Sequence, residues 1–193
     1  MTDDEGLWRA ARGGDPGAFE AIYGRHRDRV FGQASRLLRS TIEAEDVTAL
    51  VFLEAWRRRE VVRVVDGSIL PWLLVTTNHV VQNTARAGRR HRRALERIAG
   101  LAPLDARTES AFDRVEAAEG VEVVRRAFAA LRPGDRDVLT LCVVHELSMA
   151  SAAAALDVPV GTVKSRLSRA KRRLAALVGP SSRDVLTVKE EIL

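Results

Sequence analysis

The stretch that decides the fold is LSMASAAAALDVPVGTVKSRLSRAKRRL, residues 147–174. Ser148 is a good N-cap for a short alanine-rich helix that ends near Leu156. Asp157 follows, where a left-handed residue is often needed, and Asp tolerates that conformation better than most residues. Pro159 cannot continue the first helix but can start a second. A short helix, a tight turn and a basic helix form the helix-turn-helix layout.

The basic second helix has two different faces. Six of the ten residues from 164 to 173 are Lys or Arg. At about 100° per residue, one narrow sector is apolar and holds Val163, Leu167, Ala170 and Leu174. The opposite sector holds Gly161, Ser165, Ser168 and Arg172, with Lys164 and Arg169 at its flanks. Small serines let a helix approach base edges, and Lys and Arg reach purine acceptors or phosphates. A solvated basic face and a membrane-surface helix are the alternatives.

Composition favours a packed helical protein. Hydrophobic residues make up 46% of the 193 residues, which is enough for a core, whereas 5% are aromatic. The net charge of +5 suggests nucleic acid or an acidic partner surface. Cys142 is the one cysteine, so an internal disulfide is excluded and a reducing compartment is favoured. The acidic start is no signal peptide and no apolar run spans a membrane, so we expect a cytoplasmic protein.

Two amphipathic helices are predicted in the first third of the chain. Asp15 is a plausible N-cap for a helix over residues 16–39, in which apolar residues recur at helical spacing. Ser40 and Glu43 have the spacing of a capping box, and a second helix follows to about Arg59.

A loop and a third helix are expected next. VVRVVDGS, residues 61–68, is interpreted as a loop that ends in a turn, with a short strand as the alternative. The following helix tolerates Pro71 in its first turn. It ends in RAGRRHRR, residues 86–93, which carries five Arg and one His. Such a run predicts a patch that tracks phosphates, although a solvated helix end is the alternative.

These segments predict an all-α protein with two small helical domains joined by a flexible linker. The first domain covers residues 1–93, and residues 94–117, where periodicity is broken, form the linker. The second domain, residues 118–178, ends in the helix-turn-helix and is followed by a tail, residues 179–193.

Three of these segments resemble an extracytoplasmic-function (ECF) sigma factor, the minimal promoter-recognition subunit of bacterial RNA polymerase. VPVGTVKSRLSRAKRRL, residues 158–174, is similar to the family's −35-reading motif. AEDVTALVFLEAWRR, residues 44–58, and PWLLVTTNHVVQN, residues 71–83, are similar to the domain that grips polymerase and opens the −10 element. Asp157 stands where the family frequently has Gly.

The resemblance implies site residues on both domains. Contacts to the −35 element would come from Lys164, Ser165, Ser168 and Arg169, and the helical geometry adds Arg172. The loop from Val64 to Ser68, with Asp66, Gly67 and Ser68, would receive a flipped −10 base, with Asn78 or His79 beside it. The upstream duplex backbone would be held by Arg89, Arg90, Arg92 and Arg93. The polymerase clamp would meet the helix around Asp46, Val47, Phe52 and Trp56.

The expected partners are core RNA polymerase and promoter DNA, and ECF factors are commonly held by an anti-sigma protein. No membrane insertion, small-molecule substrate or cofactor is expected. A stand-alone helix-turn-helix transcriptional regulator is the alternative, and an interaction protein with an acidic partner is a further one. An enzyme is disfavoured because the four histidines lack metal-ligand spacing and no phosphate-cradling loop or nucleophile elbow occurs. No metal site is therefore predicted.

Overall fold

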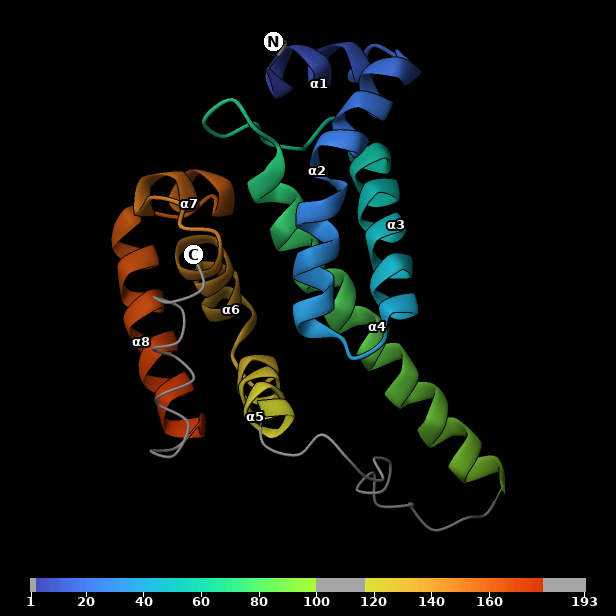
Figure 1. Cartoon of the computed structure of the whole chain (residues 1–193), viewed down its shortest axis with the longest axis vertical. Helices are drawn as coiled ribbons and strands as arrows, with labels where there is room; N and C mark the ends of the chain where they lie inside the picture. Colours follow the sequence, from blue (N-terminus) through green and yellow to red (C-terminus); the bar gives the residue numbers. More distant parts are fainter. Residues whose placement is uncertain (1–2, 100–116, 179–193) are drawn as a thin grey trace.

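The computed structural model describes residues 3–99 and 117–178, and within these ranges the regular elements are helical (Figure 1). The elements are α1 (Asp4–Arg12), α2 (Pro16–Leu37), α3 (Thr41–Arg57), α4 (Leu70–Ala99), α5 (Ala117–Ala129), α6 (Pro133–Leu139), the π-helical turn η1 (Thr140–Val144), α7 (Met149–Leu156) and α8 (Val160–Val178). None of the helices in the described part of the chain is long and apolar enough to cross a membrane.

Side-chain caps fix where the first three helices begin. Asp15 accepts from the backbone N–H of Gly17 over 2.9 Å, and Ser40 accepts from that of Glu43 over 3.3 Å, which confirms both predicted caps. Asp3 caps α1 in the same way by accepting from Gly6 over 2.9 Å. The sequence analysis did not predict α1.

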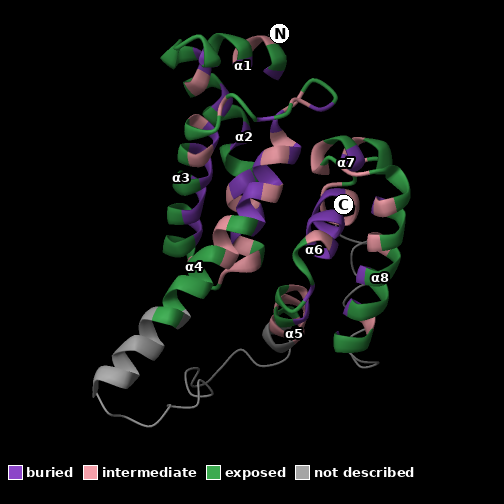
Figure 2. Cartoon of the chain, turned by 180° about the vertical axis from the view of Figure 1, so that it is seen from behind, coloured by how far each residue is buried: buried purple, intermediate pink, exposed green. Residues whose placement is uncertain are grey.

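Helices α1 to α4 form the first body around one apolar core. Trp8 of α1 is 2% exposed and packs near Phe19 of α2, which in turn lies edge-on to Trp56 of α3. Ile22 and Leu73 are fully buried between these helices. Figure 2 shows the buried residues on the sides where α2, α3 and α4 face one another. The core therefore holds α1 against the body that carries the predicted −10 loop.

Helices α5 to α8 form the second body and contain the helix-turn-helix. Ser148 caps α7 by accepting from the N–H of Ser151 over 3.0 Å. Asp157 ends α7 in the left-handed conformation, with φ 54° and ψ 49°, as its position predicted. Val163 and Ala170 of α8 are fully buried against the rest of this body.

The two bodies pack against each other. The first half of α4 contacts α6, η1 and α7, and α2 contacts α5. Leu74 of α4 is fully buried in one cluster with Val138, Leu141 and Val163 of the second body. We call this the closed arrangement. The rest of α4 extends beyond the second body (Figure 1) and continues to Ala99, six residues into the segment expected as linker. The remaining linker and the tail lie outside the described residues.

Candidate nucleic-acid interface

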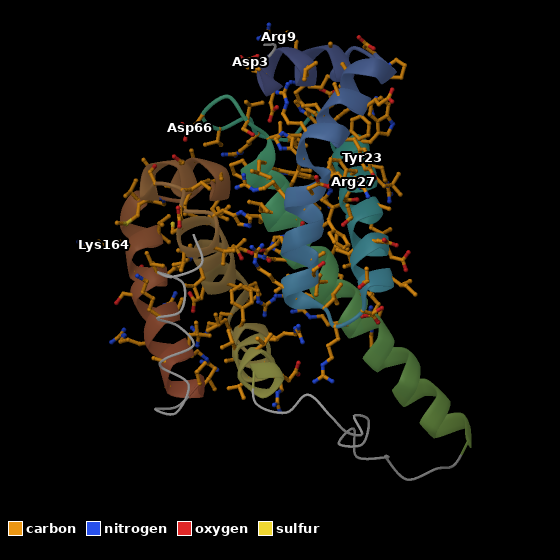
Figure 3. The ribbon with its side chains drawn as sticks, in the orientation of Figure 1. Asp3, Arg9, Tyr23, Arg27, Asp66 and Lys164 are labelled. Atoms are coloured by element: carbon orange, nitrogen blue, oxygen red, sulfur yellow. The ribbon has the colours of Figure 1, made fainter. Side chains whose placement is uncertain are left out.

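The outer face of α8 carries the cluster predicted to read the −35 element. Its inner side is buried in the second body. The exposed side chains on the opposite side are Lys164, Ser165, Ser168 and Arg172. Figure 3 shows Lys164 on the side of α8 that faces away from the rest of the chain. The Ser165 hydroxyl donates back to the Thr162 carbonyl over 3.0 Å, so this side chain lies against the helix backbone and does not project from that face. This face can approach a duplex groove.

Arg169 has a partner inside its own domain. Its Nε donates to Asp135 Oδ2 over 3.0 Å, and its Nη2 donates to Oδ1 over 2.8 Å. Asp135 lies in the first turn of α6 and is 2% exposed. The hydrogen bonds and charge of Asp135 raise the pKa of Arg169. Arg169, predicted as a −35 contact, thus ties α8 to α6, an interaction that helical spacing alone does not reveal.

The predicted −10 loop is a tight turn with an exposed tip. Backbone hydrogen bonds join Val65 and Ser68 in both directions, over 2.8 and 3.0 Å. Asp66 and Gly67 between them are both left-handed, with φ of 51° and 74°, the conformation of a two-residue hairpin turn. Asp66 lies at the outer end of the loop (Figure 3). Asp66 and Gly67 are exposed, whereas the Ser68 side chain turns inward.

The closed arrangement covers one of the predicted −10 residues. Asn78 is fully buried because α6 and η1 lie over it. Its Nδ2 donates to Asp137 Oδ1 over 2.9 Å and to Thr140 Oγ1 over 3.0 Å, and its Oδ1 accepts from Gln33 Nε2 over 3.0 Å. Asn78 reaches DNA only if the two bodies separate.

His79, the alternative −10 residue, lies at the edge of the same contact. Its side chain is half exposed, and its Nε2 lies 3.2 Å from Asp137 Oδ2. The hydrogen bond to Asp137 raises the pKa of His79, and this effect outweighs burial. Arg63, which precedes the −10 loop, donates to Asp157 over 2.7 Å. An ion pair therefore joins the −10 loop region to the turn of the helix-turn-helix.

The Arg run, residues 86–93, lies in the second half of α4, which extends beyond the second body (Figure 1). Arg90 is exposed. The side chains of Arg89, Arg92 and Arg93 lie outside the described residues, so their assignment to the upstream duplex stays a prediction.

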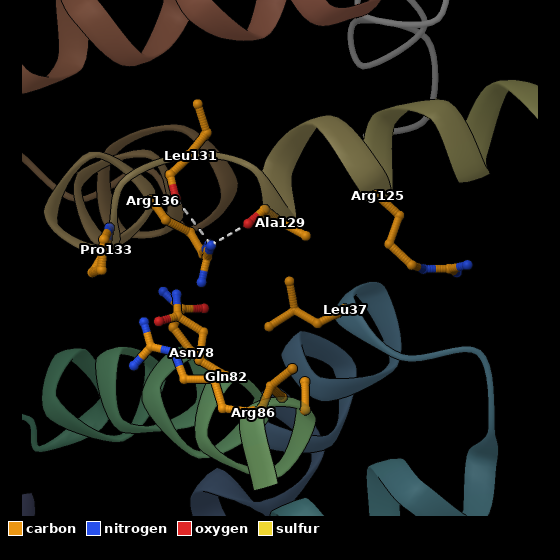
Figure 4. Close-up of a pocket in the computed structure, with 11 residues that line it drawn as sticks. Leu37, Asn78, Gln82, Arg86, Arg125, Ala129, Leu131, Pro133 and Arg136 are labelled. Carbon is orange, nitrogen blue, oxygen red and sulfur yellow. Dashed lines mark hydrogen bonds between the residues drawn. The ribbon is translucent and has the colours of Figure 1, made fainter. Parts of the chain in front are cut away.

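Arginine side chains from both bodies line a cavity between them (Figure 4). It has a volume of about 210 Å³ and is lined by Arg86 of α4 and by Arg125 and Arg136 of the second body, among others. Arg136 is 5% exposed and donates to the carbonyls of Ala129 and Leu131 over 2.6 and 3.1 Å. Burial lowers the pKa of Arg136; the charge of Asp137 opposes this effect, and the charge of Arg86 adds to it. Like charges thus face each other across the contact.

Helix α3 places the predicted polymerase contacts on two sides. Asp46 is exposed and Trp56 is half-buried, whereas Val47 and Phe52 are each 3% exposed and belong to the core. Two other apolar side chains, Leu50 and Leu53, are 45% and 52% exposed. Leu53 lines a shallow, mostly apolar pocket together with Pro16, Phe19, Tyr23, Ala49, Phe52 and Trp56. The sequence analysis did not single out Leu53.

Two family models match this chain, one on each body. "Sigma-70 region 2" matches residues 22–97, which span α2 to α4, and "Sigma-70, region 4" matches residues 122–174, which span most of α5 to α8. The chain belongs to the sigma-70 family. It is an RNA polymerase sigma factor of the ECF type, and the presence of region 2 disfavours a stand-alone helix-turn-helix regulator.

Curated relatives agree with this assignment. The ECF RNA polymerase sigma factor SigK of Mycobacterium tuberculosis (strain ATCC 25618 / H37Rv) is 28% identical over 185 residues, which cover 90% of this chain and 92% of the relative. SigK of Mycobacterium sp. (strain KMS) is 27% identical over 192 residues, with 93% of each chain covered. The sigma factor thus matches these relatives over nearly their whole length.

Two solved structures share the fold. CnrH, solved in complex with the cytosolic domain of CnrY, has a TM-score of 0.59 and 23% identity, with 92% of this chain and 97% of that one covered. RpoE, solved with the anti-sigma factor NepR from Bartonella quintana, has a TM-score of 0.51 and 22% identity, with 83% and 96% covered. At this level of identity, both comparisons show that the helices are arranged in the same fold.

Within the described residues, no group of three His, Cys, Asp or Glu side chains could hold a metal ion. The polar clusters described above are instead hydrogen-bonded contacts between helices. The chemistry that the described surfaces offer is binding: a cationic helix face, an exposed loop tip and an apolar helix face.

Proposed function

We propose that this sigma factor directs core RNA polymerase to promoters by binding the −35 duplex with α8 and opening the −10 element with region 2. The factor acts by binding, without catalysis of its own, and it works in the cytoplasm with polymerase. The observation that carries the proposal is the outer face of α8, where Lys164 and Arg172 flank exposed serines on a helix-turn-helix. Serines allow close approach, and the cations supply donors for bases and phosphates.

Strand opening is assigned to the exposed turn of region 2. Unstacking a base costs a few kcal/mol, and a receiving element that is already ordered can offset this cost without losing conformational freedom of its own. Asp66 and Gly67 form such a preformed tip. His79 is half exposed on α4, the helix that directly follows the turn, and Asn78 of the same helix becomes accessible once region 4 separates.

Polymerase binding is assigned to the outer side of α3. Leu50 and Leu53 expose apolar surface there, and Trp56 and Asp46 border it. Exposed apolar side chains gathered on one helix mark a protein-binding surface. Val47 and Phe52 support this surface from the core.

We infer that promoter binding requires the closed arrangement to open. Burial of Asn78 under α6 supports this inference, because a fully buried amide cannot meet a base. Arg86 and Arg136 carry like charges on opposite sides of the contact, which also favours separation. An anti-sigma protein is the proposed partner of the closed form, since RpoE was solved with one. A mostly apolar groove between α2 and α5, lined by Leu37, Val121, Val124 and Phe128 among others, could take an apolar helix of that partner.

The deciding experiment is run-off transcription with core polymerase over a random promoter library, followed by footprinting on the selected promoter. We expect protection of a −35 block together with permanganate-reactive thymines at −10. Lys164→Ala should weaken the −35 footprint, whereas the control Arg27→Ala, which removes an exposed cation of α2 (Figure 3), should leave it unchanged. Protection at −35 without −10 reactivity would contradict the two-site proposal.

A further inference from the structure

Asp4, the first residue of α1, is a buried carboxylate that joins two separate parts of region 2. Its side chain is 3% exposed. From α2, it accepts from Arg25 Nη1 over 2.6 Å and from His26 Nε2 over 2.5 Å. From the end of the −10 loop, it accepts from Ser68 Oγ over 2.7 Å and from the backbone N–H of Ile69 over 3.1 Å. One carboxylate thus ties the loop to α2.

The carboxylate is ionised in this setting. Burial alone would raise the pKa of Asp4, but the hydrogen bonds from Ser68 and Arg25 and the interactions with His26 outweigh it, so the pKa lies below its ordinary value. Burial lowers the pKa of His26, so the neutral ring donates its Nε2–H. An ionised acceptor makes stronger hydrogen bonds than a neutral one, which strengthens the tie to the loop.

The tie acts at the base of the turn and leaves its tip free. The Ser68 hydroxyl donates to Asp4 and accepts from the N–H of Leu70 over 3.2 Å. Ile69 is fully buried in the core. Asp66 and Gly67, two residues earlier, stay exposed. Asp4 therefore fixes the point at which the loop leaves the body by contacting Ser68 at its end, without contacting Asp66 or Gly67 at its tip.

We propose that Asp4 is a positioning residue for −10 opening: it holds the loop from Val64 to Ser68 in its base-receiving form before DNA arrives. The inference rests on the proposed function of that loop. A loop that is already ordered loses little conformational freedom when it captures a base, whereas a released loop loses more and captures less. α1, which carries Asp4 and is held in the core by Trp8, is thereby part of the opening machinery.

The test uses holoenzyme on a selected promoter with 2-aminopurine placed at successive non-template positions of the −10 element. Wild-type factor should give a fluorescence increase at the flipped position, and no increase at any position would overturn the proposed function itself. Asp4→Asn keeps the side chain's size but loses its charge and one acceptor oxygen. We expect about a tenfold lower opening equilibrium, because a hydrogen bond to a charged group is worth about that factor.

A second template separates positioning from a merely structural role. The base at the flipped position is removed, so the loop has nothing to capture. We expect the difference between wild type and Asp4→Asn to disappear on this abasic template, whereas a general defect would persist on it. Persistence of the full difference, or no difference on the intact promoter, would overturn the inference.

Two further variants keep the test decisive. Arg25→Gln removes one of the four hydrogen bonds without changing α1 or the loop, and it should show the same dependence on the flipped base. It carries the test alone if Asp4→Asn does not fold. Glu5→Gln is the matched control, because Glu5 is the next carboxylate on α1 but is exposed and pairs with Arg9 of the same helix over 3.1 Å. Glu5→Gln should open the promoter like wild type.

Discussion

Asn78 of region 2 donates its Nδ2–H to Oδ1 of Asp137 in region 4 over 2.9 Å, so a side chain predicted to meet the −10 element is hydrogen-bonded inside the other domain. Thr140 and Gln33 complete its partners, and all four residues are buried. A fully satisfied polar cluster of this kind specifies one geometry, because a partly satisfied one is costly. The closed arrangement is therefore a defined state that competes with DNA for the same amide.

Asp137→Ala should open the closed arrangement. The substitution leaves Asn78 Nδ2 and His79 without a carboxylate acceptor, and an unsatisfied buried polar group costs about 1–3 kcal/mol. Small-angle scattering of the free factor should report a larger radius of gyration than wild type. Asp28→Ala, which removes an exposed carboxylate of α2, serves as the control. An unchanged radius for Asp137→Ala would contradict a role for this contact in closure.

Closure should weaken as the pH rises. Asp137 raises the pKa of His79 through their hydrogen bond, while Arg136 and Arg58 oppose the shift. A raised pKa means that the protonated pair stabilises closure fully below the ordinary value of 6.5 and that this contribution is lost as pH passes the raised pKa. Fluorescence transfer between labels on the two domains should fall as the pH rises above 6.5.

His79→Gln should flatten that pH profile, because glutamine keeps a polar side chain without a titrating ring. His26 gives no competing signal in this range: burial lowers its pKa, so it titrates in more acidic solution and inside region 2. A profile that stays equally steep in His79→Gln would assign the transition to another group.

Lys164→Ala should reduce promoter discrimination without changing stability. Lys164 is exposed on the outer face of α8, and a lost base contact costs about 1–3 kcal/mol of discrimination. The measurement is competition between promoters that differ at single −35 positions, together with a thermal unfolding curve. Equal discrimination by wild type and variant would remove Lys164 from the set of base-reading residues.

Arg169→Ala should lower the stability of the second body. The substitution leaves Asp135 as a carboxylate, 2% exposed, that has lost its guanidinium partner. Denaturant unfolding should give a lower midpoint for Arg169→Ala, and the double variant Arg169→Ala/Asp135→Ala should be less destabilised than the sum of the two single ones. Additive effects would show that the two residues act independently.

Leu53→Glu should lower the affinity for core polymerase and leave the fold intact. Leu53 is 52% exposed, so a charge at this position stays solvated in the free factor. In the complex the same charge would be buried against polymerase, which lowers the affinity. Phe52→Ala, one residue earlier, should instead cost about 3–5 kcal/mol of unfolding free energy, because Phe52 is a core residue. Binding to immobilised core polymerase and thermal unfolding separate the two effects. Normal polymerase binding by Leu53→Glu would move the interface elsewhere.

Much of the fold could be predicted from local signals in the sequence. The caps at Asp15 and Ser40, the left-handed Asp157 and the two faces of α8 depend on residues at most a few turns apart, and the structure confirms them. Helix α1 also had local signals, an Asp cap and an acidic first turn, but it is nine residues long and one of its three buried positions, Asp4, is charged. The length of α4 was underestimated because the apolar periodicity breaks after the Arg run at residues 86–93, yet the helix continues to Ala99.

The candidate site was predictable only in part, because its decisive contacts join distant residues. Nothing near Asp4 indicates that Ser68 will donate to it, and nothing near Arg169 indicates Asp135. Helix α3 is apolar over a wide arc, so spacing could not tell the buried Phe52 from the exposed Leu53. Periodicity identifies an apolar face, but it does not identify which element will cover that face.

Asp157 in the turn of the helix-turn-helix has two roles: its backbone is left-handed, and its carboxylate accepts from Arg63 of region 2. Glycine would relax the left-handed backbone there, yet it would remove the carboxylate that reaches across to region 2. Asparagine would keep the tolerance and lose the charge. A substitution that relaxes the DNA-reading unit taken alone would thus remove one of the contacts between the two bodies, so the backbone of this turn and the resting state of the whole factor depend on the same residue.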